Sequence, residues 1–124
     1  MKMYEILELS VLGNSLKDRK MSLKTTYKFA RLMHEIAEDI DFYQTQFNKI
    51  VKQYGVYENG VPKLSKDGST IIIVSGKEEE CKQKIQELQN LNVTIDNIKF
   101  TLDELEGIDL TLSEMTTLIP LIEE

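Results

Sequence analysis

The chain has 124 residues, of which 41% are hydrophobic and 29% charged, and its formal net charge is −6 at pH 7. This length suits one domain, and the composition is that of an ordinary soluble globular protein. The net charge argues against a general nucleic-acid binder, and no stretch approaches the roughly 20 apolar residues of a membrane span. We therefore expect a single domain over residues 1–124 that does not enter a membrane.

The start of the chain, MKMYEILELS, lacks the apolar core and the small-residue cleavage site of a signal peptide. Cys81 is the only cysteine, which excludes an internal disulfide and any site built from several cysteines. Both features predict a cytoplasmic protein.

Residues 3–12 alternate well enough to predict a strand with Leu7, Leu9 and Val11 on one face. Gly13-Asn14 then breaks the pattern, and a polar stretch follows as far as Met21.

The dominant predicted element is a helix that begins at the N-cap Ser22 and ends before Gly55. From Ile36 its apolar residues recur in steps of 4, 3, 4, 3 and 4, the a/d seam of a helix packed lengthwise on another helix. Such a helix would be about 50 Å long, whereas a domain of this size has a radius of gyration of about 14 Å. A second helix, a partner chain or both must therefore cover the seam, and we expect at least a dimer. The seam consists of Leu23, Tyr27, Ala30, Met33, Ile36, Ile40, Tyr43, Phe47, Ile50 and Tyr54.

The middle of the chain predicts a β-hairpin and a second helix. Asn59-Gly60 and Asp67-Gly68 are turn dipeptides, and residues 69–74 form a β-branched run. We expect that run to pair with residues 61–66, an edge strand because its proline cannot donate a ladder hydrogen bond. A capping box, Ser75-Gly-Lys-Glu78, then starts a helix over about 77–90.

The last third predicts further strands and a short helix. Residues 91–102 alternate but change face at Asp96-Asn97, which suggests a bulge or two short strands. Gly107 makes a turn, and the capping box Thr111-Leu-Ser-Glu114 starts a helix that Pro120 limits. We expect Met115, Leu118 and Ile119 to pack inward from that helix.

These elements predict an α+β fold. Its main part is a long antiparallel helical hairpin with a β-hairpin at its tip. A small sheet would form from the N-terminal strand and the strands after residue 91.

Candidate catalytic groups are few. His34, the only histidine, lies at the edge of the apolar stripe and could hold one edge of a metal site with Glu38. A genuine site needs three or four converging ligands, and the chain has no second His or Cys cluster. Cys81 shares the apolar face of its helix with Ile85, so a buried, inert thiol is expected. With no phosphate loop and no serine nucleophile elbow, we expect no enzyme, no cofactor and no metal.

Charge and aromatic residues suggest where a partner could bind. The balance is slightly basic before residue 63 and strongly acidic after it, which indicates either an ordinary solvated surface or two charged poles suited to self-association or a basic partner. Phe29 and Phe42 lie off the main seam and could form an exposed patch. The acidic candidates are Asp103, Glu104, Glu106, Asp109, Glu123 and Glu124, and the basic patch consists of Lys17, Arg19, Lys20, Lys24, Lys28 and Arg31.

Three segments carry a family resemblance. SLKTTYKFARLMHEI is similar to an opening helix motif, VKQYGVYENGVPKL to a helix end and turn, and FTLDELEGIDLTLSEMTTLIPLIEE to a closing motif. Together they resemble a family of small proteins of unknown function encoded by phages and prophages of Gram-positive bacteria, over most of residues 20–124.

The resemblance implies a phage-derived product in the bacterial host cytoplasm, with no known catalytic residues. It implies one of two roles: binding and blocking a host protein such as a defence component, or helping virion head or tail assembly. The basic patch leaves a third hypothesis open, a sponge for a small anionic nucleotide signal. A nucleic-acid contact is disfavoured because Tyr27, an aromatic residue that could stack on a base, belongs to the apolar stripe of the helix.

Overall fold

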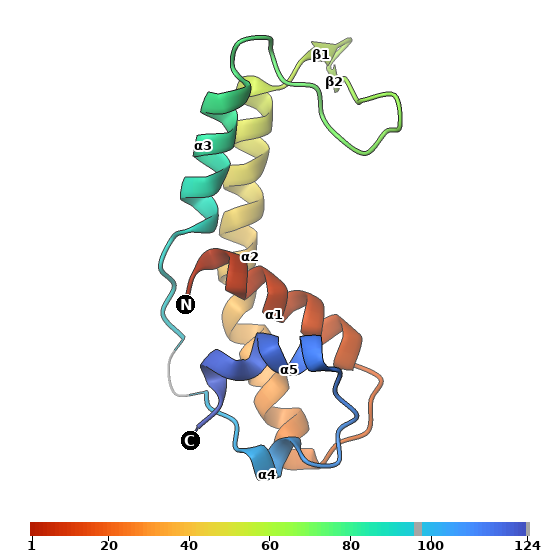
Figure 1. Cartoon of the computed structure of the whole chain (residues 1–124), viewed down its shortest axis with the longest axis vertical. Helices are drawn as coiled ribbons and strands as arrows, with labels where there is room; N and C mark the ends of the chain where they lie inside the picture. The colour runs from red at the N-terminus through yellow and green to blue at the C-terminus, as the bar shows by residue number, and fades with distance from the viewer. Residues whose placement is uncertain (96–97, 124) are drawn as a thin grey trace. The chain divides into compact units, whose positions relative to one another are not determined.

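The computed structural model describes residues 1–95 and 98–123, and its chain forms two compact units. Unit 1 comprises Met1–Ile40 and Asn92–Glu124, and unit 2 comprises Asp41–Leu91. The structure is mostly helical with one two-stranded antiparallel sheet, which agrees with an α+β fold in its coarse form (Figure 1). The elements are α1 (Met3–Leu16), α2 (Leu23–Tyr54), β1 (Tyr57–Glu58), β2 (Val61–Pro62), α3 (Glu78–Gln89), α4 (Leu102–Leu105), α5 (Leu112–Leu118) and the 3₁₀-helix η1 (Ile119–Leu121).

The N-terminal segment is a helix, so the predicted strand over residues 3–12 is wrong. Leu9 fits both a period of 2 and a helical period, and burial decides between them, because Leu9 is fully buried whereas Val11 is 67% exposed. The Glu5 carboxylate accepts a hydrogen bond from the Lys2 backbone N–H at 2.8 Å and caps the start. The buried face of α1 consists of Met3, Ile6, Leu9, Leu12 and Leu16, spaced three or four residues apart.

Gly13 lies inside α1 and does not end it. A Cβ at this position would lie 2.2 Å from the Met33 sulfur on α2. The glycine therefore lets two helices of unit 1 approach closely, a role that a turn-based interpretation of Gly13-Asn14 missed.

Helix α2 has the predicted extent. Ser22 Oγ accepts a hydrogen bond from the Thr25 backbone N–H at 3.2 Å, which confirms the predicted cap. The register of its first half differs from the predicted seam, since Leu23 is 86% and Tyr27 62% exposed. The buried positions of this half are Thr25, Phe29, Leu32 and Ile36.

The core of unit 1 is apolar and joins segments from both ends of the chain. The Phe29 and Phe100 rings pack at a centroid distance of 4.5 Å. An isolated bridge joins Phe100 to Ile122 and another joins Lys2 to Asn92, but the small sheet predicted from these regions does not form among the described residues. The bulge predicted at Asp96-Asn97 lies outside the described residues.

The hairpin of unit 2 lies at another turn than the predicted one, because β1 pairs with β2 and residues 69–74 form no regular strand. Asn59 and Gly60 have positive φ values of 53° and 78°, the tight turn that joins β1 to β2. The predicted pairing of 61–66 with 69–74 survives as a bridge between Leu64 and Ile71. The two predicted strands therefore come together at one bridge and do not form the expected ladder.

Helix α3 has nearly the predicted bounds but a different cap. Its N-cap is Lys77 without a side-chain cap bond, so the predicted capping box at Ser75 is wrong. The Glu78 carboxylate instead accepts a hydrogen bond from the Gly76 backbone N–H at 2.9 Å. Cys81 is buried, as expected, and burial raises the pKa of its thiol.

The C-terminal helices follow two capping boxes. The predicted box at Thr111 starts α5, which ends before Pro120, and Gly107 has a φ of 89° in the preceding turn. Leu118 is buried as predicted, but Ile119 is exposed and Leu121 takes the inward position. Across residues 1–95 and 98–123, no helix has both the length and the apolar character that a membrane crossing requires.

Candidate functional site

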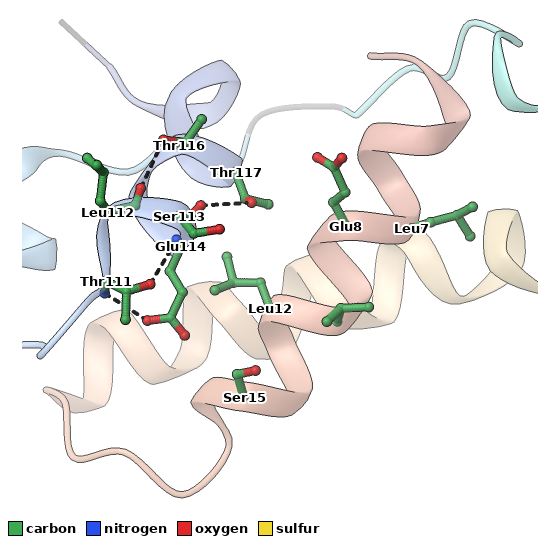
Figure 2. Close-up of a pocket in the computed structure, with 11 residues that line it drawn as sticks. Leu7, Glu8, Leu12, Ser15, Thr111, Leu112, Ser113, Glu114, Thr116 and Thr117 are labelled. Atoms are coloured by element: carbon green, nitrogen blue, oxygen red, sulfur yellow. Dashed lines mark hydrogen bonds between the residues drawn. The ribbon is translucent and has the colours of Figure 1, made fainter.

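Unit 1 contains a groove between α1 and α5, with a volume of about 800 Å³ (Figure 2). These two helices pack against each other, and Leu12 lies between them. The volume falls in the range of binding pockets, about 300–1,000 Å³. The groove is lined from α1 by Leu7, Glu8, Val11, Leu12 and Ser15, and from the α5 side by Thr111, Leu112, Ser113, Glu114, Thr116 and Thr117.

The α5 wall of the groove is rich in polar residues, but the hydroxyls of Thr116 and Thr117 are already hydrogen-bonded within the helix. Thr116 Oγ1 donates to the Leu112 carbonyl at 2.9 Å, and Thr117 Oγ1 donates to the Ser113 carbonyl at 3.2 Å. Because these hydroxyls bond to their own helix, the threonines can present their methyl groups to the groove. Leu112 adds an aliphatic side chain that is 85% exposed.

An ion pair holds the start of α5 in place. Arg19 forms a bidentate contact with Glu114, with N–O distances of 2.6 and 2.8 Å, and also donates to the Asp109 carbonyl at 2.8 Å. Glu114 accepts a further bond from the Thr111 backbone N–H at 2.9 Å. The Arg19 hydrogen bond first, and then the Thr111 backbone, lower the pKa of Glu114 to about 2. We call this contact the α5 clip.

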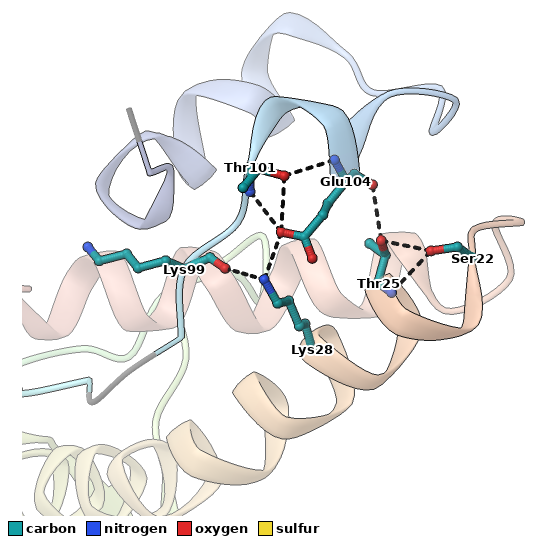
Figure 3. Close-up of polar contacts among 6 residues, drawn as sticks. All are labelled: Ser22, Thr25, Lys28, Lys99, Thr101 and Glu104. Carbon is teal, nitrogen blue, oxygen red and sulfur yellow. Dashed lines mark hydrogen bonds and ion pairs between the residues drawn. The ribbon is translucent and has the colours of Figure 1, made fainter.

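A second ion pair holds α4 in the same way (Figure 3). The Lys28 ammonium donates to Glu104 Oε1 and to the Lys99 carbonyl, both at 2.7 Å, and lies 5.7 Å from the centre of the Phe100 ring. The Thr101 backbone N–H donates to the same Glu104 oxygen at 3.0 Å. The Lys28 hydrogen bond is the main reason that the pKa of Glu104 is lowered to about 2. We call this contact the α4 clip.

The α4 clip continues into buried polar contacts on α2. Thr25, the buried polar residue of the first half of α2, donates from Oγ1 to the Glu104 carbonyl at 3.1 Å and accepts a bond from Ser22 Oγ at 3.0 Å. Glu104 Oε2 is buried and accepts no hydrogen bond from the residues described. Buried polar groups are costly without partners, so the paired oxygen and the backbone contacts must hold this carboxylate in place.

The two clips change the interpretation of the charged segments. Glu104 was predicted to face a partner, but its side chain is only 10% exposed and is engaged within unit 1. Arg19 and Lys28 of the predicted basic patch are likewise used internally, so the two poles partly neutralise each other within one unit. The acidic candidates that remain exposed are Asp103, Glu106, Asp109 and Glu123, and the exposed basic ones are Lys17, Lys20, Lys24 and Arg31, whereas Glu124 lies outside the described residues.

The aromatic candidates behave differently from each other. Phe29 is 7% exposed and packs on Phe100, so the expectation that it contributes to an exposed patch is wrong. The cause is the shifted register of α2, in which Phe29 follows Thr25 by one turn. Phe42 is 48% exposed, in unit 2.

His34 is exposed, and no group of three or more His, Cys, Asp or Glu side chains in the described part of the chain converges on a possible metal position. The expectations of no enzyme, no metal and no cofactor remain predictions.

Sequence reasoning missed the groove itself, because the strand predicted over residues 3–12 gave Glu8 and Val11 no helical neighbours. It also missed the α4 box, although Thr101-Leu-Asp-Glu104 repeats the signal of Thr111-Leu-Ser-Glu114 ten residues earlier. That signal was sufficient to find the box, since both obey the same T-x-x-E pattern.

Comparisons of the chain with protein-family models, with curated proteins and with solved structures gave no match. The phage and prophage resemblance therefore stays a prediction.

Proposed function

We propose that this chain is a phage-derived, non-enzymatic binding protein that inhibits or redirects a host protein, such as a defence component, in the bacterial cytoplasm. The observation that supports it most is the α1–α5 groove, which exposes Val11 and Leu112 beside hydroxyls that are bonded internally. A groove of this kind suits an amphipathic helix that inserts its apolar face.

We also propose that α3 covers part of the second half of α2 as its antiparallel partner. Cys81 and Leu88, seven residues apart, are the buried side chains of α3, a spacing that keeps both on one face. The seam residues Ile40, Tyr43, Phe47 and Ile50 of α2 are half-buried, which leaves part of the seam for other contacts.

The proposed function is tested by capture of host proteins with groove variants. We expect the wild-type chain to capture a stoichiometric host protein from lysate, and the double variant Val11→Glu, Leu112→Glu to lose it by at least about tenfold. Both positions are exposed, so the variant should keep its fold, which circular dichroism would check.

The matched control is Val61→Glu, Leu64→Glu, which changes two similarly exposed aliphatic residues in unit 2. Retention of the captured protein by the groove variant would contradict the proposed site. Recovery of phage structural proteins alone would contradict host inhibition and favour the alternative role in virion assembly.

A further inference from the structure

The start of α2 has one exposed face, opposite its buried side, that no other segment of the described chain covers. Leu23 and Tyr27 lie one turn apart and are 86% and 62% exposed. Arg31 continues the same stripe by a further turn, and Lys24 lies beside its start. Neither cation forms an ion pair or a side-chain hydrogen bond within residues 1–95 and 98–123. This face is thus an apolar pair with a free positive charge near each end.

The α1–α5 groove has the complementary chemistry. Its two most exposed apolar side chains, Val11 and Leu112, come one from each wall. Its described lining residues include two carboxylates and no lysine or arginine. Arg19 already neutralises Glu114, which leaves Glu8 as the one uncompensated charge of that lining. An occupant should therefore carry apolar side chains together with a cation.

The two surfaces also match in length. The α1 wall extends from Leu7 to Ser15, eight residue steps or about 12 Å along a helix. The exposed stripe of α2 extends from Leu23 to Arg31, which is also eight steps and about 12 Å. Each surface therefore presents about two helical turns, enough for an apolar pair at i and i+4 with a flanking charge.

We propose that a second copy of this chain occupies the groove, with its Leu23 and Tyr27 against Val11 and Leu112 and its Lys24 or Arg31 beside Glu8. Both surfaces belong to unit 1 of each copy. The inference rests on the proposed function because it uses the same groove. A host protein would then have to displace the second copy to bind there.

The size of the contact argues for a reciprocal dimer. A stable, specific interface buries about 800 Å² on each partner, more than one two-turn helix segment supplies. In a two-fold arrangement each copy provides one groove and one stripe, so the contact forms twice and the buried area doubles. Its apolar centre and charged ends follow the usual pattern of a core surrounded by a polar rim.

The test is a charge exchange followed by sedimentation of the full chain over about 1–200 μM, a range that brackets micromolar dimers. We expect the wild type to dimerise. Glu8→Lys alone and the double variant Lys24→Glu, Arg31→Glu should each weaken dimerisation at least about tenfold, because like charges then face each other. An equimolar mixture of the two variants should recover the wild-type affinity, since both contacts in the mixed dimer pair opposite charges.

Glu87→Lys and Lys52→Glu in unit 2 are matched controls, because they make the same charge changes at exposed positions outside the proposed contact. A wild-type monomer at 200 μM, a chain of copies in place of a dimer, or a mixture that stays monomeric would each overturn the proposal. A monomer that still captures a host protein through the groove would leave the proposed function standing. A dimer that captures nothing would instead overturn the proposed function alone.

Discussion

The two halves of α2 show that a regular apolar pattern and a buried face need not coincide. In unit 1 the first half buries Thr25, Phe29, Leu32 and Ile36, in steps of 4, 3 and 4. In unit 2 the second half carries the cleaner sequence seam, yet its seam residues Tyr43, Phe47 and Ile50 are only half-buried. Within residues 41–91, all of which the structure describes, the buried apolar side chains are Tyr54, Cys81 and Leu88. The strongest periodicity in the sequence therefore does not coincide with the most deeply buried helix face.

The largest expected effect compares a core position of unit 1 with a seam position of unit 2. Leu9→Ala should lower the free energy of unfolding by about 2–5 kcal/mol, because Leu9 is fully buried and a cavity remains. Ile50→Ala should cost less than about half as much, since Ile50 already contacts water. Urea unfolding of both variants, with amide hydrogen exchange to separate the units, measures the difference. Equal losses would show that the unit 2 seam is covered in solution.

Acid should act on unit 1 through its clips. The pKa values of Glu104 and Glu114 are lowered to about 2 from an ordinary value of 4.5. A carboxylate with a lowered folded pKa contributes stability that is complete above pH 4.5 and is lost as the pH falls towards 2. We expect the free energy of unfolding to fall across that range, with a slope that corresponds to the uptake of up to two protons.

The double variant Glu104→Gln, Glu114→Gln should show a shallower fall in the same titration. Glu87→Gln, an exposed position of α3, is the control and should keep the wild-type slope. An unchanged slope in the double variant would mean that the clips are not formed in solution.

The smallest expected effect compares capping boxes. Thr101→Ala and Thr111→Ala should each lower the free energy of unfolding by about 0.5–2 kcal/mol, because each hydroxyl accepts a bond from a helix N–H at 3.1 Å. Ser75→Ala should change it by less than about 0.5 kcal/mol, because Ser75 does not cap α3. Thermal and urea unfolding would distinguish these values. A comparable loss at Ser75 would show that its box forms after all.

Long-range periodicity made the extent of α2 predictable, and local residue chemistry did the same for the turn at Asn59-Gly60 and the cap at Thr111. The buried face at the start of α2 was predicted wrongly because two sets of residues there have helical spacing. The predicted set is Leu23, Tyr27 and Ala30, and the buried set is Thr25, Phe29 and Leu32. Only the contacts of Phe29 with Phe100 and of Thr25 with Glu104, about 70–80 residues apart, decide between them. Such pairings are absent from a local pattern.

The candidate site was less predictable than the fold. Residues 3–12 satisfied a strand pattern. Gly13 looked like the end of that strand, but it lies inside α1 and lets this helix approach Met33. Without α1 as a helix, Glu8 and Val11 could not be placed opposite α5. The sequence could not separate Arg19 and Lys28, which form ion pairs within unit 1, from Lys24 and Arg31, which are exposed.

The two clips use Glu104 and Glu114, which lie ten residues apart in one short segment. They hold this segment on the rest of unit 1 at two points, as a bivalent ligand is held by its receptor. When one clip opens, the other keeps its partner close, at an effective concentration set by a tether of a few residues, so reclosure is favoured over release. Residues 101–114 should therefore dissociate from Arg19 and Lys28 only when both ion pairs are broken at the same time. A wall of the groove held in this way stays in place through brief, single openings.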